Sequence, residues 1–381
     1  MSNVELRGIT WEHPRGLNSV KESSPKYSEV VPNVKIHWDF RSLQAFADRS
    51  IEELADEFDL LVIDHPHIPL AASEGIFAPF VKPELATQLQ LLKNQSVGKS
   101  FESYEHQGQV WALPIDAAAQ VSASRISELQ NHPENWDEVL ELAKAGRVVC
   151  PLKPIDAYSS FITIAATKGY PPMSRQGQFL PIEQTLEVLD FMMEFVQYLP
   201  KSNFAMNPIE VADLLSTDSP WIYSPLLFGY TNYSRFGFRK HLLRYRNIPR
   251  GETGLVGSLL GGAGIAVSSR SANISQAHNY ALWLAAAEIQ KTVYFDAGGQ
   301  PGNSVAWEDI RLNNLTQDFF FGTRETLEGA YLRPRDARYI EVQDRVSVLV
   351  TQTLMGDLNG SEFAKTANQI CEKFLGATNG I

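Results

Sequence analysis

The sequence predicts an α/β protein made of two lobes. The chain has 381 residues, which exceeds the size at which a single hydrophobic core stops growing. Segments with the period-two pattern of strands alternate with helical stretches from the N-terminus onward, which is typical of α/β proteins. No internal repeat and no low-complexity linker separates the halves. We therefore expect two lobes that exchange chain segments.

The first residues predict a βαβαβ unit. Residues 4–11 and 33–40 alternate between apolar and polar side chains, and residues 16–31 between them can form a helix. The nearly all-apolar segment 58–64 follows a helical stretch at 50–57, as a buried parallel strand follows its crossover helix.

A second α/β lobe is predicted to start near residue 116, after an extended segment that runs from Ile115 to Arg125. A helix is expected from Pro133 to Ala143, with acidic residues in its first turn, where the helix dipole favours them. The later expected elements are a short strand at 147–151, helices at 157–168, 182–199 and 208–216, strands at 219–225 and 259–268, a helix at 275–290, and helices from 339 onward.

Composition excludes several classes of function. The formal net charge of −11 is spread along the chain and would repel a phosphate backbone, so we expect no nucleic-acid partner. No apolar run approaches the roughly 18 residues of a transmembrane helix, so no membrane insertion is expected. Cys150 and Cys371 lie far apart without a CxxC spacing, and we interpret both as buried apolar residues.

Known cofactor motifs and a signal peptide are not visible in the sequence. The P-loop, HExxH, GxSxG and EF-hand patterns do not occur, and no GxGxxG follows the first strand, so no cofactor is expected. Residues 1–11 lack the basic and apolar regions of a secretory signal. We expect a cytoplasmic protein if the chain is complete, and a periplasmic or cell-surface protein if a signal has been removed.

Five segments resemble landmarks of one protein family, in the same order and spacing. They are Gln107–Pro114, Pro133–Glu138, Gly261–Val267, Glu288–Gln290 with the loop Gly298–Gly302, and Gly356–Ala364. These match patterns such as D-G-K-x-Y-G-x-P, P-x-T-W-D-E and G-G-x-x-x-A-I. The sequence thus resembles the family 1 (carbohydrate-type) extracellular solute-binding proteins of ABC transporters.

The resemblance implies a two-lobed periplasmic-binding-protein-like type II fold with a ligand cleft between the lobes. On that template, lobe one comprises residues 1–112 plus 263–310, and lobe two comprises residues 113–262 plus 311–381. The family captures its ligand by hinge closure. The implied partners are a small-molecule ligand and, for an exported protein, the membrane subunits of an ABC transporter.

Ligands of open α/β sheets bind beyond the carboxyl ends of the strands, which directs attention to the residues that follow each strand. In lobe one the candidates are Trp11, His13, Arg15, Asp64, His65 and His67. Asp116, immediately past the first crossing segment, is a further candidate because the family often places a ligand contact there. Trp11 could instead cap the core, and Arg15 could be a solvated helix-start residue. Adjacent residues of the 64–67 segment point in different directions, so no metal site is expected.

In lobe two, Lys153, Asp156 and Tyr158 follow a strand, although Asp156 could simply cap a helix. An aromatic wall could be formed by Tyr223, Ser224, Phe228 and Tyr230, or these residues could be core. Gly261 and Gly262 could admit a ligand or only permit a turn. The family template adds Asn303 and Trp307, with Arg333 and Arg335 as weaker candidates.

The leading hypothesis is a binding protein for a small polar solute, of sugar or polyol type. The alternative is a cytoplasmic enzyme on the same fold, with His13, Asp64, His65, His67 and Asp116 as acid–base groups. A cytoplasmic ligand sensor is a third class. Burial and pKa shifts of the histidines and carboxylates would distinguish catalysis from passive binding.

Overall fold

The computed structural model describes residues 3–42 and 50–376 and divides the chain into two compact units. Unit 1 comprises residues 1–118 and 261–314, and unit 2 comprises residues 119–260 and 315–381. The chain therefore passes between the units after residues 118, 260 and 314, whereas the sequence suggested crossings after 112, 262 and 310. The predicted α/β class is confirmed.

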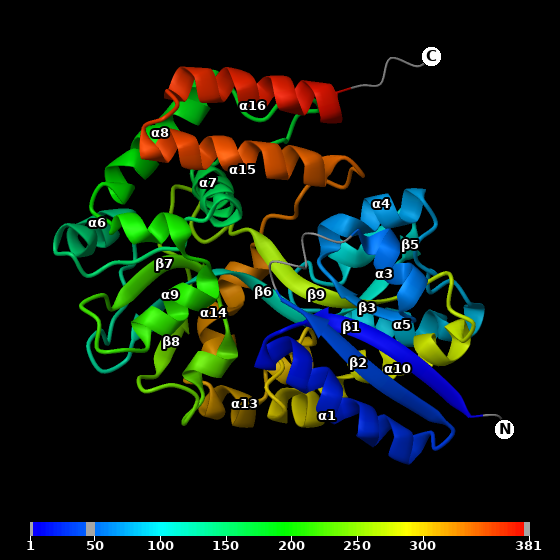
Figure 1. Cartoon of the computed structure of the whole chain (residues 1–381). Coiled ribbons are helices and arrows are strands. Elements are labelled where there is room, and N and C mark those ends of the chain that lie inside the picture. The colour runs from blue at the N-terminus through cyan, green and yellow to red at the C-terminus, as the bar shows by residue number, and fades with distance from the viewer. Residues whose placement is uncertain (1–2, 43–49, 377–381) are drawn as a thin grey trace. The chain divides into compact units, whose positions relative to one another are not determined.

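Unit 1 opens with the predicted βαβαβ unit. Strand β1 (Val4–Trp11) pairs in parallel with β2 (Val34–Arg41) and with β3 (Leu60–Ile63), and β9 (Leu260–Val267) then pairs antiparallel to β3. The connecting helices are α1 (Pro14–Val30) and α3 (Ile51–Glu57), and Figure 1 shows α1 lying along β2. The two parallel strands β1 and β3 end at the same edge of this sheet.

The other elements of unit 1 surround its apolar core. They are η1 (His65–His67), α4 (Ile68–Ser73), η2 (Pro83–Leu85), α5 (Ala86–Asn94), η3 (Glu102–Tyr104), β4 (Glu105–His106), β5 (Gln109–Val110), the first half of β6 (Ala112–Arg125), α10 (Ile274–Ala285), α11 (Ala287–Ile289), η6 (Gln290–Tyr294), α12 (Ser304–Trp307) and α13 (Ile310–Leu315). Leu6, Leu60 and Ile265 from three strands are all fully buried in this core.

The helix predicted at 275–290 ends earlier than expected. Helix α10 stops at Ala285, and after α11 the chain forms a π-helical turn, η6, in which Thr292 has a non-helical backbone (φ −115°, ψ −105°). The Gln290 side chain fixes this turn, because its amide donates to the Leu284 carbonyl (3.0 Å) and its carbonyl accepts from Gly302 N (2.8 Å). No periodicity of apolar residues signals such a turn, since the apolar positions continue through it.

Unit 2 is built on the second half of β6, which pairs antiparallel with β7 (Tyr223–Phe228) and β8 (Leu243–Arg246). The strand predicted at 147–151 is wrong. Val148 forms only an isolated bridge with Tyr223, because Pro151 has no N–H to extend the ladder and α7 begins soon afterwards.

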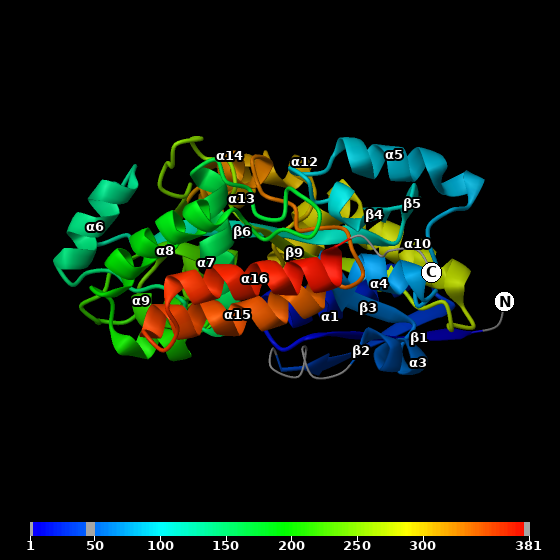
Figure 2. The same cartoon turned by 90° about the horizontal axis from the view of Figure 1, so that it is seen from above.

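Helices cover this sheet in unit 2. They are α6 (Trp136–Lys144), α7 (Pro154–Thr167), α8 (Ile182–Val196), η4 (Lys201–Ala205), α9 (Pro208–Leu215), η5 (Thr231–Ser234), α14 (Phe319–Glu328), α15 (Tyr339–Met355) and α16 (Gly360–Leu375). Figures 1 and 2 show α15 and α16 side by side, and both contribute to one core with α7 and α8. Cys150 and Cys371 lie in that core as free thiols, as predicted.

No helix within residues 3–42 and 50–376 is long and apolar enough to cross a membrane.

Candidate functional site

The carboxyl ends of β1 and β3 bring polar side chains together in unit 1, as the sequence predicted. His13 and Arg15 follow β1, Asp64 and His65 follow β3, and Asp116 comes from β6. We call these five residues the Arg15–Asp116 cluster. Parallel pairing of β1 with β3 is what places these segments, distant in sequence, at one edge of the sheet.

A buried ion pair forms the centre of the cluster. Arg15 is 4% exposed and Asp116 is 1% exposed, and Arg15 Nε donates to Asp116 Oδ2 at 2.6 Å while Nη2 donates to Oδ1. Burial raises the pKa of Asp116, and the Arg15 guanidinium opposes that rise by favouring the carboxylate. Since arginine keeps its proton, the pair is ionic, and its geometry is bidentate.

Two histidines of the cluster have structural partners. The His13 side chain is the N-cap of α1, where its Nδ1 accepts from Arg15 N at 3.1 Å. His65 is only 1% exposed, and its backbone N and Nδ1 lie 2.8 and 3.1 Å from Asp64 Oδ1. His67, in contrast, is half-buried. Asp64, with 36% of its side chain exposed, is the carboxylate of the cluster that solvent can reach.

Tyr294 also belongs to this region, and the sequence did not reveal it. Its side chain is fully buried and interacts electrostatically with both Asp116 and Arg15. The π-helical turn η6 places it, and Gly299 provides the room, since a Cβ at position 299 would collide with the tyrosine ring. The nearby Gln300 donates from Nε2 to the Ala117 carbonyl at 2.8 Å. The adjacent glycines at 298 and 299 were the one sequence signal of this close packing.

Three other candidates in unit 1 have structural roles. The Trp11 ring packs over Gly16 in the core. Asn303 is the N-cap of α12, with Oδ1 accepting from Val305 N at 3.0 Å, and it is 3% exposed. Trp307 is buried and donates from Nε1 to the Pro301 carbonyl at 2.7 Å.

Gly261 and Gly262 are half-buried in β9. Gly262 has φ +99°, and a Cβ there would lie 2.5 Å from the Asp116 carbonyl oxygen. The sequence left open whether this pair of glycines admits a ligand or permits a turn. The structure shows a left-handed backbone conformation and a close approach of two chain segments, both of which require glycine at 262.

Several candidates in unit 2 lie in its core. Tyr158 and Tyr223 are fully buried, as is Ser224, and the Tyr158 hydroxyl lies 3.1 Å from that of Tyr339. Asp156 is 4% exposed, and burial raises the pKa of its carboxyl to about 8. Tyr230 is half-buried at the start of η5.

Lys153 is half-buried, and its Nζ lies 2.9 Å from Glu210 Oε2, while Phe228 at the end of β7 is also half-buried. Of the weaker candidates, Arg333 is 6% exposed and donates to the Leu260 carbonyl at 3.2 Å, and Arg335 is half-buried. Fewer of the candidate residues on this unit are accessible than the sequence suggested.

Whole-chain comparison with solved structures identifies the fold. The maltose-bound MalE3 of T. maritima superposes with a TM-score of 0.84 at 16% identity, covering 97% of this chain and 100% of that one. A ribitol-bound ABC transporter solute-binding protein from Agrobacterium radiobacter K84 gives 0.83 at 16% identity, covering 98% and 99%. One from Thermotoga lettingae TMO, bound to alpha-D-tagatose, gives 0.81 at 16% identity, covering 99% and 100%.

The chain has the fold of the ABC-transporter sugar-binding proteins. No family model matches the sequence. No curated protein sequence matches it either. The predicted fold is therefore confirmed by similarity of structure.

A second group that the sequence did not reveal is His132 of unit 2. Its Nδ1 lies 2.7 Å from Ser122 Oγ and its Nε2 lies 2.7 Å from Ser124 Oγ, both on β6. Burial, followed by the charges of Arg246 and Arg244, lowers the pKa of His132 to about 3. The imidazole is therefore neutral near pH 7 and acts as a two-sided hydrogen-bonding partner of the strand.

Metal binding is not supported by the described part of the chain. Within residues 3–42 and 50–376, no three His, Cys, Asp or Glu side chains come together in a way that could hold a metal ion.

Proposed function

We propose that this protein is a solute-binding protein that captures a small polar ligand of sugar or polyol type. The observation that carries the proposal is the fold similarity over nearly the full length of both chains to proteins solved with maltose, ribitol and tagatose. The formal net charge of −11 is compatible with a neutral ligand. We also propose hinge closure on the ligand, as the fold implies.

Within unit 1, Asp64 is the residue that we expect to contact the ligand directly. Its carboxylate is partly exposed, and a carboxylate can accept two hydrogen bonds from neighbouring hydroxyls of a sugar. Arg15 and Asp116 are buried against each other, and we assign them the role of holding the start of α1 against β6 behind Asp64. In unit 2 the reachable candidates are Tyr230 and Lys153.

The enzyme alternative receives no support from the environment of two of its histidines, His13 and His65. A general base needs an accessible nitrogen close to the reacting proton. His13 Nδ1 accepts from a backbone N–H, and His65 is almost fully buried. Passive binding through hydrogen bonds requires neither histidine to change its protonation state.

A role in transport leads to two further proposals, one about the partner of the protein and one about its location. The proteins with similar folds are described as ABC transporter solute-binding proteins, so we propose that the membrane subunits of such a transporter are the partner. The corresponding place of action is outside the cytoplasmic membrane.

Calorimetric titration with maltose, ribitol, tagatose and mannitol tests the binding proposal. We expect at least one to bind, and we expect Asp64→Asn to weaken that binding by about tenfold, because a hydrogen bond to a charged acceptor is replaced by a neutral one. Asp357→Asn, at an exposed site in unit 2, is the matched control and should bind like the original protein. Failure of a broad panel of sugars and polyols to bind would contradict the proposal.

A further inference from the structure

One segment of unit 2 has a charge opposite to that of the whole molecule. The chain carries a net charge of −11, yet residues 219–250 contain no Asp or Glu. Five cations cluster within residues 235–246, which we call the basic segment: Arg235, Arg239, Lys240, Arg244 and Arg246. The segment consists of a loop, residues 235–242, followed by β8.

Phe236 projects from this loop. Its side chain is 94% exposed, and the next residue, Gly237, has a left-handed backbone (φ +83°) with open space around its Cβ position. The structure describes all of residues 219–250, and within them Phe236 is the one large hydrophobic residue that is exposed. An almost fully exposed phenylalanine is unfavourable in water, because its whole apolar area remains hydrated.

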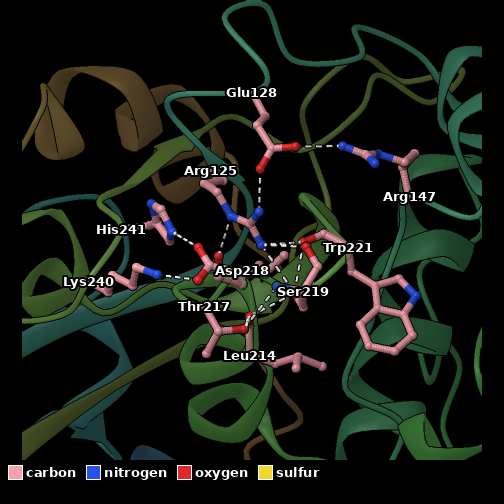
Figure 3. Close-up of polar contacts among 11 residues, drawn as sticks. Arg125, Glu128, Arg147, Leu214, Thr217, Asp218, Ser219, Trp221, Lys240 and His241 are labelled. Atoms are coloured by element: carbon pink, nitrogen blue, oxygen red, sulfur yellow. Dashed lines mark hydrogen bonds and ion pairs between the residues drawn. The ribbon is translucent and has the colours of Figure 1, made fainter.

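The loop is held in place by two acidic residues outside it. The Asp218 carboxylate binds both Lys240 and His241, with Nε2 of the histidine at 2.7 Å, as Figure 3 shows. Lys240 and then His241 lower the pKa of Asp218 to about 2, so this carboxylate stays ionised near neutral pH.

The second anchor is Asp213, which accepts from Arg239 Nε at 2.7 Å and from the Tyr233 hydroxyl at 2.8 Å. The Arg239 guanidinium also lies 4.5 Å from the centre of the Phe238 ring. Asp213 and Asp218 bind two of the five cations, and Asp318 interacts electrostatically with Arg246. The segment itself contains five cations and no acidic residue. Phe236 is therefore presented from an anchored, cationic loop.

Strand β8 adds two of these cations. It pairs with β6 alone among the described strands, and Arg244 and Arg246 alternate with the buried Leu243 and Tyr245. Alternation places both arginines on one face of the strand. Both arginines are half-buried, so part of each side chain remains open to solvent.

We propose that Phe236 and the basic segment form a docking surface for an anionic lipid bilayer. Cationic side chains attract acidic headgroups, and an aromatic ring beside them can enter the boundary between headgroups and acyl chains. Such a contact would orient the acidic molecule with this part of unit 2 toward the membrane. The inference does not depend on the proposed function, because it rests on no ligand-binding residue.

An acidic protein surface is the competing partner, and the structure favours it less. The centre of a protein–protein interface is usually an apolar patch in which several residues pack together. Here a single ring stands among cations, and the other aromatic residues of the loop region, Tyr233 and Phe238, are buried or half-buried. A bilayer surface can accept a lone projecting ring without a preformed pocket.

Co-sedimentation of the full chain with lipid vesicles tests the proposal. Vesicles of phosphatidylcholine alone are compared with vesicles in which one third of the lipid is phosphatidylglycerol, at low and at physiological salt. We expect partitioning onto the anionic vesicles to exceed that onto the neutral ones by at least about tenfold, and to weaken as salt screens the charges.

Two variants and two controls make the test specific. Phe236→Ser should reduce partitioning several-fold, and Lys240→Glu should reduce it by about tenfold. The controls are Ile310→Ser, which removes an exposed hydrophobic residue of unit 1, and Lys26→Glu, which reverses an exposed cation of α1. Circular dichroism verifies that every variant is folded.

Equal partitioning onto both kinds of vesicle, or no partitioning onto either, would overturn the proposal. So would variants at Phe236 and Lys240 that partition like the two controls. Phe236-dependent binding to an acidic protein without binding to vesicles would assign the surface to a protein partner and likewise exclude the bilayer.

Discussion

At the scale of single residues, unit 1 contains an ion pair in which both partners are buried. Arg15 and Asp116 are separated by about a hundred positions and are both almost completely shielded from water. Desolvation of two ions is costly, and their mutual attraction repays it only while both partners are present. The pair therefore makes the local fold strongly dependent on each of its members.

Replacing Asp116 by Asn should lower the free energy of unfolding by about 3–5 kcal/mol, because the Arg15 charge would remain buried without a counter-ion. Urea denaturation followed by circular dichroism measures this loss. Asp39→Asn is the control, since the Arg7–Asp39 pair is more than half exposed and should be worth less than about 1 kcal/mol. A loss at Asp116 no larger than that of the control would contradict this account.

His132 gives unit 2 a defined pH dependence. Its pKa is about 3 in the folded protein and 6.5 in an unfolded chain, so the unfolded state binds a proton first as the pH falls. The contribution of His132 to the free energy of unfolding is therefore fully present above about pH 6.5. Between pH 6.5 and 3 it decreases by up to about 1.4 kcal/mol per pH unit.

A His132→Asn variant isolates that effect. At neutral pH we expect it to be less stable than the original protein, and the difference should shrink as the pH is lowered from 6.5 toward 4, since asparagine does not titrate. Urea denaturation at a series of pH values measures the difference, and the same substitution at the exposed His37 controls for loss of an imidazole. A difference that stays constant with pH would refute the assignment.

The sequence predicted some of these residues as site candidates and missed others. It gave His13, Arg15, Asp64 and His65 as candidates, because polar residues that follow parallel strands lie at one edge of the sheet, and it gave Asp116 from the family resemblance. It did not predict that Arg15 and Asp116 bind each other, since pairing across distant positions depends on tertiary contact. The sequence did not reveal His132 and Tyr294, because no local sequence pattern distinguishes them from other histidines and tyrosines.

At the scale of elements, β9 depends on glycine where it approaches β6. Gly262 has φ +99°, and any side chain there would meet the backbone of Asp116 and Ala117. Glycine is required at position 262 for two separate reasons, the left-handed backbone conformation and the close approach of neighbouring backbone atoms. A control glycine that has only the left-handed conformation distinguishes the two effects. Gly356, at the end of α15, has φ +87° and open space around its Cβ position.

We expect Gly262→Ala to be destabilised more than Gly356→Ala. The control should lose about 1 kcal/mol, which is the ordinary cost of alanine in this conformation, whereas the clash with backbone atoms should add about 1–3 kcal/mol at position 262. Thermal and urea unfolding of both variants give the comparison. Equal losses would show that the chain relaxes around position 262 without strain.

Elements were more predictable than single contacts. The βαβαβ unit follows from hydrophobic periodicity alone, and α1, α3 and β3 lie close to where it placed them. The segment 147–151 is apolar enough for a strand, but Pro151 and the early start of α7 leave only a bridge. The π-helical turn after α11 was not predictable, because side-chain bonds from Gln290 produce it rather than a change in apolar pattern.

At the scale of the whole molecule, the order of the short family landmarks along the chain predicted the fold better than any single motif did. Four of the glycines in the segments that carry the family resemblance, Gly108, Gly262, Gly298 and Gly356, adopt positive φ angles in the structure. Glycine is favoured at such positions, because it adopts these conformations with less strain than other residues. The fold was predicted from these landmarks although the chain is only 16% identical to the similar structures.

The ligand could not be predicted in the same way. Ligand identity depends on a few side chains whose exposure is decided by packing, and several aromatic candidates of unit 2 proved to be core residues. Tyr158 and Tyr223 illustrate the difficulty. Both are buried, but an aromatic residue has the same local sequence pattern whether its side chain faces solvent or the interior.

The most direct test of the solute-binding account is thermal unfolding of the purified protein in the presence of individual sugars and polyols, with each stabilising compound analysed by mass spectrometry after incubation. A true ligand at 100 times its dissociation constant should raise the free energy of unfolding by about 2.7 kcal/mol and be recovered chemically unchanged. A compound that stabilises the protein but is converted to a product would contradict the account and favour an enzyme.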